Sequence, residues 1–159
     1  MSEEITVRRA RADEMESAAQ LAGKLVRMHH EADPGRFFLT ENVEQGYAWW
    51  FGKELERSAA VILVALEGDT LVGYAYGAFE ERDWNLLLDE HGALHDLYVV
   101  EGVRQRGVGR RLVEAMIGEL EALGARRIVL GTMVRNEAAQ RLFGACGFRP
   151  TLLEMTRGG

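Results

Sequence analysis

The sequence has 159 residues, 47% of them hydrophobic and 28% charged, which is the composition of a globular domain. A surplus of 25 acidic over 19 basic side chains gives a net charge of −6 and argues against a nucleic-acid-binding chain. The longest apolar run, residues 59–66, is too short to cross a bilayer, and the start Met1-Ser2-Glu3-Glu4 lacks the basic region of a secretory signal. We therefore expect one cytoplasmic domain over residues 1–159, with no nucleic-acid or membrane partner.

The first third of the chain predicts a short strand and two helices. Apolar and polar residues alternate at 5–7, as in a strand, and apolar residues then recur at helical spacing from 15 to about 30. The turn signal Asp33-Pro34-Gly35 ends this first helix. A second helix is expected from about Thr40, with one apolar face made of Val43, Tyr47, Trp50, Phe51 and Leu55.

The rest of the chain alternates between strands and helices. The expected elements are a hairpin of strands 61–66 and 71–79, a strand 93–100, a helix between Gly109 and Gly124, a strand 127–134, a helix capped by Asn136 and stopped by Gly147, and a last strand 151–155. The order β-α-α-β-β-β-α-β-α-β predicts an α/β (α+β) fold, in which helices flank both faces of a mixed central sheet.

Positive charge gathers in the segment that joins the third-last strand to the helix after it. Residues 104–111 read Arg-Gln-Arg-Gly-Val-Gly-Arg-Arg, and glycines at a helix N-terminus let backbone N–H groups face an anion. The segment is not a P-loop, because no Lys-Ser or Lys-Thr follows Gly107, and Leu112 stands where a dinucleotide fingerprint needs glycine. It predicts a phosphate-bearing ligand, with an ordinary solvated turn as the alternative.

Two motifs in this half resemble those of the GCN5-related N-acetyltransferase (GNAT) superfamily. The acetyl-CoA motif Q/R-x-x-G-x-G/A is matched by residues 104–109, after the strand residues 97–99. The second motif, N-x-x-A-x-x-L-Y/F-x-x-x-G-F, is matched by Asn136, Ala139, Leu142, Phe143, Gly147 and Phe148. The resemblance implies a mostly antiparallel central sheet and an acetyl-CoA-dependent N-acetyltransferase that uses direct attack in a ternary complex.

The resemblance also implies which residues bind acetyl-CoA. Backbone amides of 106–110 would hold the pyrophosphate, and the main chain of Leu97 and Val99 would bind pantetheine as an added strand does. There the strand would splay from its neighbour at a bulge, and a backbone N–H would polarise the thioester. The expected set is Leu97, Tyr98, Val99, Arg104, Gln105, Arg106, Gly107, Val108, Gly109, Arg110, Arg111, Asn136 and Phe143.

Phe143 departs from the family pattern. Many relatives carry a tyrosine there, whose phenol protonates the departing CoA thiolate, and a phenylalanine cannot donate a proton. A thiol with a pKa near 8.5 is a tolerable leaving group, so water, Tyr98 or Cys146 could supply the proton instead. Asn136 would contact the pantetheine or the catalytic water in addition to capping its helix.

The candidate base is one of two neighbours on the strand 93–100. His95 and Asp96 stand where polyamine-acetyltransferase relatives carry a Glu-Asp pair, and strand alternation predicts that only one of them faces the acceptor. The unperturbed pKa of histidine favours His95, although a half-buried histidine bonded to backbone is an open alternative. The catalytic candidates are therefore His95, Asp96 and Asn136.

The acceptor is expected to be a small primary amine, polyamine-like in charge. The acidic residues Glu80, Glu81, Asp83, Asp89 and Glu90 either attract such a cation or form a solvated loop. Candidate walls for its pocket, unless they are core residues, are Phe37, Phe38, Trp49, Trp50 and Trp84. No metal is expected, because Cys146 is the single cysteine and no carboxylate stands at ligand spacing beside His29 and His30.

Two other functions stay open at this stage. Phe143 fits an acyl-CoA-binding regulatory module without turnover, and a long open groove would indicate a protein lysine or N-terminal acetyltransferase. Gly131 stands where ribosomal-protein acetyltransferases carry glutamate, which argues against that subgroup. A second copy in a homodimer is an open alternative for a partner.

Overall fold

The structure is a computed structural model that describes residues 3–159. Met1 and Ser2, which open the acidic N-terminal segment, lie outside the described residues. The elements follow the order β1 (Ile5–Arg9), α1 (Met15–Ala32), α2 (Val43–Glu54), β2 (Ala60–Glu67), β3 (Thr70–Glu80), β4 (His91–Val99), α3 (Val108–Ala122), β5 (Ile128–Leu130) and α4 (Glu137–Ala145). Short 3₁₀ helices, η1 (Ala12–Glu14) and η2 (Glu101–Arg106), precede α1 and α3.

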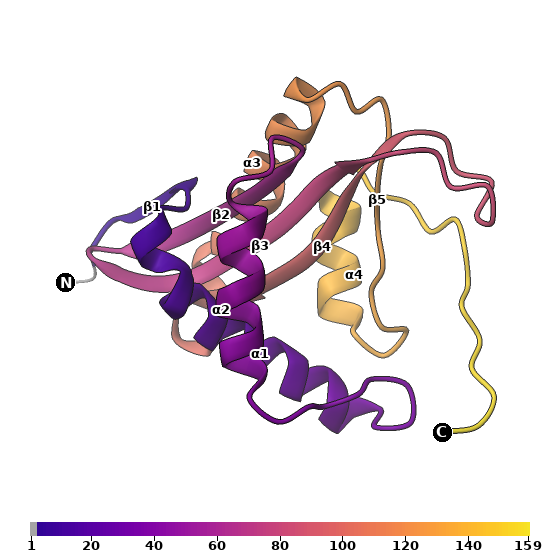
Figure 1. The fold of residues 1–159 in the computed structure, drawn as a ribbon, viewed down its shortest axis with the longest axis horizontal. Coiled ribbons are helices and arrows are strands. Elements are labelled where there is room, and N and C mark those ends of the chain that lie inside the picture. The colour runs from indigo at the N-terminus through magenta and orange to yellow at the C-terminus, as the bar shows by residue number, and fades with distance from the viewer. Residues whose placement is uncertain (1–2) are drawn as a thin grey trace.

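The five strands form one sheet in the order β1-β2-β3-β4-β5 (Figure 1). Neighbouring strands from β1 to β4 run antiparallel, and β5 alone runs parallel to its neighbour β4. Helices α1 and α2 cover one face of the sheet, and α3 and α4 cover the other (Figure 1). The predicted mixed, mostly antiparallel sheet with helices on both faces is confirmed.

Each face of the sheet has its own apolar core. Residues on alternate positions of a strand point to opposite faces, so Leu63 packs toward α3 while Val64 packs toward α1. Leu112, Val113 and Met116 of α3 are fully buried on the first face, as their helical spacing predicts. Phe51 of α2 is fully buried on the second.

Two predicted strands differ from the structure. The strand expected at 127–134 is limited to β5, because β4 offers β5 partners only from Gly92 to Leu94. Residues 151–155 form no strand, and the chain after α4 runs in extended form along the side of the molecule (Figure 1). Leu152 is 82% exposed there, and this alternating sequence pairs with no strand of the sheet.

The second helix begins three residues later than predicted. Asn42 precedes it in the left-handed conformation, at φ +57°, so the helix starts at Val43. Trp50, expected on the buried face, is exposed. The described residues contain no helix that combines the length and the apolar character needed to span a membrane.

Gly77 occupies a close contact in the centre of the sheet, and its replacement is expected to destabilise the fold. A Cβ at this position would lie 2.8 Å from the Ala93 carbonyl oxygen and 2.9 Å from Met116 Sδ. Because the first neighbour is backbone, Gly77→Ala is expected to cost about 1–3 kcal/mol of unfolding free energy. Gly118→Ala is the matched control, since Gly118 lies exposed within α3 with nothing within 4 Å of its Cβ position.

The control is expected to change stability in the opposite direction. Alanine replaces glycine in a helix interior with a gain of about 0.5–1 kcal/mol. Urea unfolding of both variants measures the difference. Equal stability of Gly77→Ala and the wild type would show that β3 and β4 can separate without cost at this point.

Candidate active site

The edge of β4 opens half-way along the strand. Tyr76 pairs with Asp96 but the next residue, Gly77, pairs with Leu94, so His95 is an extra residue that bulges from the β4 strand. Pairing of β4 with β5 stops at Leu94, just before the bulge. The predicted bulge and the splaying of the two strands are therefore present.

The open edge exposes main-chain groups of β4. Gly92 N–H donates to the Arg127 carbonyl on the β5 side, and Val100 N–H donates to the Val72 carbonyl on the β3 side, each at 2.9 Å. Main-chain groups of successive strand residues face alternate sides, and the bulge adds one residue to this count. The N–H and C=O of Leu97 and Val99 therefore face away from β3. An extended ligand in the gap would meet both groups of Leu97 and the N–H of Val99 as a neighbouring strand does, while the Val99 carbonyl already accepts a bond from Arg104.

The glycine segment forms the N-terminus of α3. Gly107 is its N-cap, with φ +74° and ψ 15°, a left-handed conformation that favours glycine. The first backbone bond of the helix runs from Arg111 N–H to the Gly107 carbonyl at 3.1 Å. The amides of residues 108–110 precede this bond and are the unpaired donors typical of a helix start, which suits a phosphate.

The rest of the segment has structural as well as binding features. Val108 is fully buried, whereas Gln105 is exposed on η2. A Cβ on Gly109 would lie 3.2 Å from Leu142 Cδ2. Gly109 therefore allows α3 to approach α4 closely. The glycine motif by itself does not predict this packing role.

The four arginines of the segment all have partners within the chain. Arg104 Nε donates to the Val99 carbonyl at 2.7 Å, Arg106 binds Glu67 and the Glu3 carbonyl, Arg110 pairs with Glu114, and Arg111 donates to the Ile5 carbonyl. Arg104 thus stands at the end of the open β4 edge, and its guanidinium also lies 5.4 Å from the Tyr98 ring centroid. Arg104 and Arg110 keep exposed guanidinium groups near the start of α3.

The motif residues of α4 have mainly packing roles in the structure. Asn136 caps the helix, since its Oδ1 accepts the Ala139 N–H at 3.0 Å, as predicted. Phe143 is 8% exposed and packs edge-to-face on Phe148, with ring centroids 6.0 Å apart. Partial burial raises the pKa of the Cys146 thiol, so this thiol stays protonated at neutral pH.

A cavity of about 560 Å³ lies on the α1 and α2 side of the sheet, where β4 bulges. His95 and Asp96 line it together with aromatic rings, and the full lining is Leu25, Val26, His29, Arg36, Phe37, Phe38, Thr40, Glu41, Asn42, Val43, Gly46, Tyr47, Trp50, His95 and Asp96. Three of the five predicted aromatic walls are thus placed here, while Trp49 is not among them. The size is that of a small-molecule site.

Asp96 is the charged group best shielded from water in this cavity. Its carboxylate accepts a hydrogen bond from the Tyr74 hydroxyl at 3.0 Å. Burial raises the pKa of Asp96 above its usual value, and the Tyr74 bond offsets part of this effect. Burial, with the charge of Asp96 beside it, raises the pKa of Tyr47 to about 12, so that phenol remains protonated.

His95 lines the same cavity as Asp96, although strand alternation predicted opposite faces. The bulge breaks the alternation and lets both side chains reach one site. The His95 ring stacks on Tyr76 with centroids 5.5 Å apart, and its Nε2 lies 3.0 Å from Glu80 Oε2. A proton on Nε2 shared with Glu80 leaves Nδ1 as the basic nitrogen.

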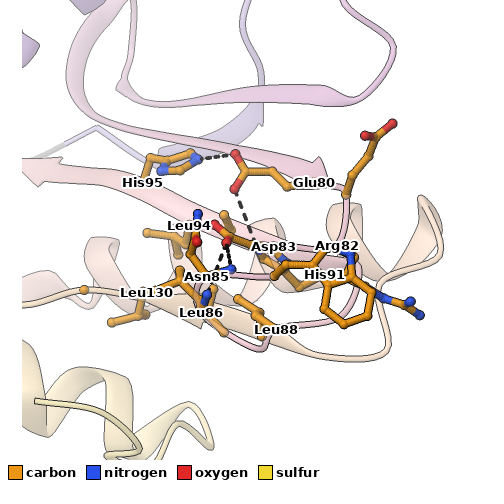
Figure 2. A pocket seen from close by; sticks show the side chains of 15 residues that line it. Glu80, Arg82, Asp83, Asn85, Leu86, Leu88, His91, Leu94, His95 and Leu130 are labelled. Atoms are coloured by element: carbon orange, nitrogen blue, oxygen red, sulfur yellow. Dashed lines mark hydrogen bonds and ion pairs between the residues drawn. The ribbon is translucent and has the colours of Figure 1, made fainter.

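A second cavity, of about 710 Å³, lies on the other side of His95 under the β3–β4 connection (Figure 2). Glu80 bridges the two histidines that border it, with His91 Nε2 3.4 Å from its second oxygen. Two other acidic residues of the predicted set have local roles, since Asp89 pairs with Arg82 and Asp83 accepts backbone N–H groups of its own loop. Trp84 lines this cavity and not the first.

Comparison with known proteins identifies the family to which this fold belongs. The model of the acetyltransferase (GNAT) family matches residues 24–148. The chain belongs to the GNAT family. Among curated GNAT relatives, D-amino-acid N-acetyltransferase HPA3 of Saccharomyces cerevisiae is 28% identical over 88 residues, which are 55% of this chain and 53% of that protein.

A second relative is the L-methionine sulfoximine/L-methionine sulfone acetyltransferase of Salmonella typhimurium, 28% identical over 113 residues, 70% of this chain and 63% of that protein. The chain thus spans between half and two thirds of the length of both relatives. The solved structure of AAC(6')-Iy with the bisubstrate analog CoA-S-monomethyl-acetylneamine aligns with a TM-score of 0.78 at 18% identity, over 98% of each chain. This likeness confirms the GNAT fold.

Two residues of the GNAT site take their place from the tertiary structure. The sequence groups Glu80 with an acidic loop, yet it lies on β3 and reaches His95 because the register sets Glu80 opposite His91. Arg36 lines the first cavity from the α1–α2 connection, where no periodicity exists.

Across residues 3–159 no three His, Cys, Asp or Glu side chains gather as a metal site requires.

Proposed function

We propose that this GNAT protein is an acetyl-CoA-dependent N-acetyltransferase that acts on a small primary amine. One observation carries the proposal: the open edge of β4 extends from the bulge at His95 to Val99, beside the start of α3, and the bulge lies in a cavity with an acid and an imidazole. An extended donor and a cationic acceptor can therefore meet at the bulge.

The donor would lie along the open edge of β4. Acetyl-CoA supplies the acetyl group as a thioester. The unpaired amides of residues 108–110 suit its pyrophosphate, with the exposed guanidinium groups of Arg104 and Arg110 nearby. The outward N–H of Leu97, two residues past the bulge, is placed to donate to the thioester carbonyl and to stabilise negative charge on that oxygen.

The acceptor is a small molecule in this proposal. A cavity of about 560 Å³ has the volume of a small-molecule site. The names of the two curated relatives point to amino acids and to amino-acid analogues as their acceptors. The structural neighbour AAC(6')-Iy holds an analogue built on acetylneamine, which is also small.

His95 and Asp96 have different roles in activating the amine. Asp96 attracts the ammonium form into the cavity, and His95 Nδ1 takes the proton as the amine nitrogen attacks. Glu80 fixes the imidazole through Nε2 and stabilises the positive charge that the ring gains. A C–N bond forms, the C–S bond breaks, and the electron pair of the C–S bond leaves with sulfur.

Phe143 has no part in this chemistry. Its ring is buried against Phe148 and carries no proton to donate. A thiol has a pKa near 8.5, so the CoA thiolate leaves without an acid in contact and takes a proton from water. We infer that the substitution removes an acid without removing the reaction.

The function is tested by the release of free CoA thiol from acetyl-CoA in the presence of amines, amino acids and peptides. We expect release with small amines, and initial-rate plots that intersect, as a ternary complex requires. Tight acetyl-CoA binding without release on any acceptor would replace this proposal with an acyl-CoA-binding module. Release with peptides alone would indicate a protein acetyltransferase.

A further inference from the structure

Arg36 binds a carboxylate at the edge of the acceptor cavity. It lies in the α1–α2 connection and lines the same cavity as Asp96 and His95. Its Nε lies 2.5 Å from Glu154 Oε2 and its Nη2 lies 3.0 Å from Glu154 Oε1, a bidentate arrangement. The guanidinium also lies 4.8 Å from the Phe37 ring centroid, which helps to fix its position.

The carboxylate comes from a tail with few other contacts. Residues 149–159 form no helix or strand, and within residues 3–159 the two bonds from Arg36 to Glu154 are the side-chain hydrogen bonds of this segment. The backbone of Gly159 also lies against Gly35, next to Arg36. The tail therefore meets the rest of the protein at the edge of the acceptor cavity.

The pair is open to exchange with solvent. The Glu154 side chain is 64% exposed and that of Arg36 is 41% exposed. An ion pair of this kind is held weakly, so another carboxylate at sufficient concentration can take the place of Glu154. Arg36 is thus a preformed carboxylate site whose present occupant can leave.

The cavity offers complementary groups for a zwitterion. Arg36 gives a cation, Asp96 gives an anion, and Phe37, Phe38 and Trp50 give apolar surface in the same cavity. An amine without a carboxylate would leave Arg36 unused. A molecule with both groups could satisfy both charges at once.

We propose that Arg36 binds the carboxylate of an acceptor that carries both an amine and a carboxylate, and that Glu154 occupies this position when the acceptor is absent. The inference rests on the proposed function, because it assigns the substrate class of the same cavity. The tail then competes with the acceptor. The apparent affinity of the protein for the acceptor is lowered in proportion to the fraction of time that Glu154 occupies Arg36.

The test compares amino acids with their carboxamides. Calorimetry measures the binding of each pair without acetyl-CoA, and CoA release measures kcat/KM. In Arg36→Gln we expect the preference for the acid over the amide to fall about 10- to 100-fold, the range for hydrogen bonds to a charged group. Arg126→Gln, an exposed arginine between α3 and β5, is the control and should keep the preference.

Glu154→Gln tests the tail and should act in the opposite direction. If Glu154 occupies Arg36 for half to nine tenths of the time, the dissociation constant and KM for the acid should fall about 2- to 10-fold, with kcat unchanged. Glu121→Gln, an exposed glutamate in α3, is the control. Amino acids with one to five carbons between amine and carboxylate would report the separation that the site accepts.

The outcomes separate the two proposals. Equal acid and amide binding in the wild type and Arg36→Gln would overturn the inference, while CoA release with simple amines would keep the proposed function. Binding of acids through Arg36 without release on any acceptor would support the carboxylate site and refute the transferase. An unchanged KM in Glu154→Gln would reduce the Glu154 contact to a simple tail anchor.

Discussion

His95→Gln is expected to lower kcat about 10²- to 10⁴-fold, the usual contribution of a general base. Glutamine keeps a polar group of similar length but cannot take the proton from the amine. Steady-state measurement of kcat in both proteins gives the change.

A substitution of Glu80, which contacts His95, provides a second test of His95 as the general base. Glu80→Gln keeps a hydrogen-bond acceptor for His95 Nε2 but removes the charge that stabilises the imidazolium. We expect a smaller loss of kcat than in His95→Gln, because the imidazole stays in place and only the charge beside it is lost. A His95→Gln protein with the wild-type kcat would assign the base to another group.

Asp96→Asn should separate acceptor binding from proton transfer. Loss of the anion is expected to raise KM for cationic amines more than it lowers kcat. Burial raises the pKa of Asp96 in the folded state above its value in the unfolded chain. The charged carboxylate therefore destabilises the folded protein at high pH, and this cost is absent below the pKa of the unfolded chain. The variant should therefore melt at a higher temperature than the wild type at pH 7.

The stability gain of Asp96→Asn should disappear in acid. As the pH falls through the unfolded pKa of aspartate, near 3.9, the wild-type carboxyl becomes protonated in both states, so the penalty that asparagine removes fades. Asparagine can still accept the Tyr74 hydroxyl, which keeps the neighbouring hydrogen bond. Thermal melts at pH 7 and pH 3.5 measure the difference, and a lower melting temperature at pH 7 would contradict the burial argument.

Gly107→Val is expected to abolish acetyl-CoA binding, with a loss of affinity of at least about 100-fold. Valine disfavours the left-handed conformation that Gly107 adopts at φ +74°, so the start of α3 should reorganise and its free amides should turn away. Calorimetric titration with CoA measures the affinity.

Gly124→Val controls for the cost of strain. Gly124 follows the other end of α3, also with positive φ and nothing within 4 Å of its Cβ position. Both substitutions should lower the stability by at least about 1–2 kcal/mol, but only Gly107→Val should lose CoA. Equal CoA affinity in the two variants would remove the start of α3 from the donor site.

Local sequence signals predicted the framework of the donor site. The Asn136 cap, the glycines at 107 and 124, and the apolar face of α3 all depend on contacts within a few residues, so their spacing is visible in the sequence. The two GNAT motifs then located the bulge that the register between β3 and β4 confirms.

Local signals were less reliable where a segment needed a partner. Residues 151–155 have strand-like composition but pair with no strand, and β5 is short because its pairing with β4 stops before the bulge. Strand pairing depends on a neighbour distant in sequence, so composition alone overpredicts it. The same bulge overturned the alternation argument for His95 and Asp96.

The sequence by itself determined that the chain has the GNAT fold, with glycines at the start of α3 and an acid and a histidine at the centre of β4. The tertiary structure alone decided what surrounds them. Glu80 reaches His95 across two strands, and Glu154 reaches Arg36 across 118 residues. Such contacts arise from strand register and from the path of the chain, which fix partners that no local spacing encodes.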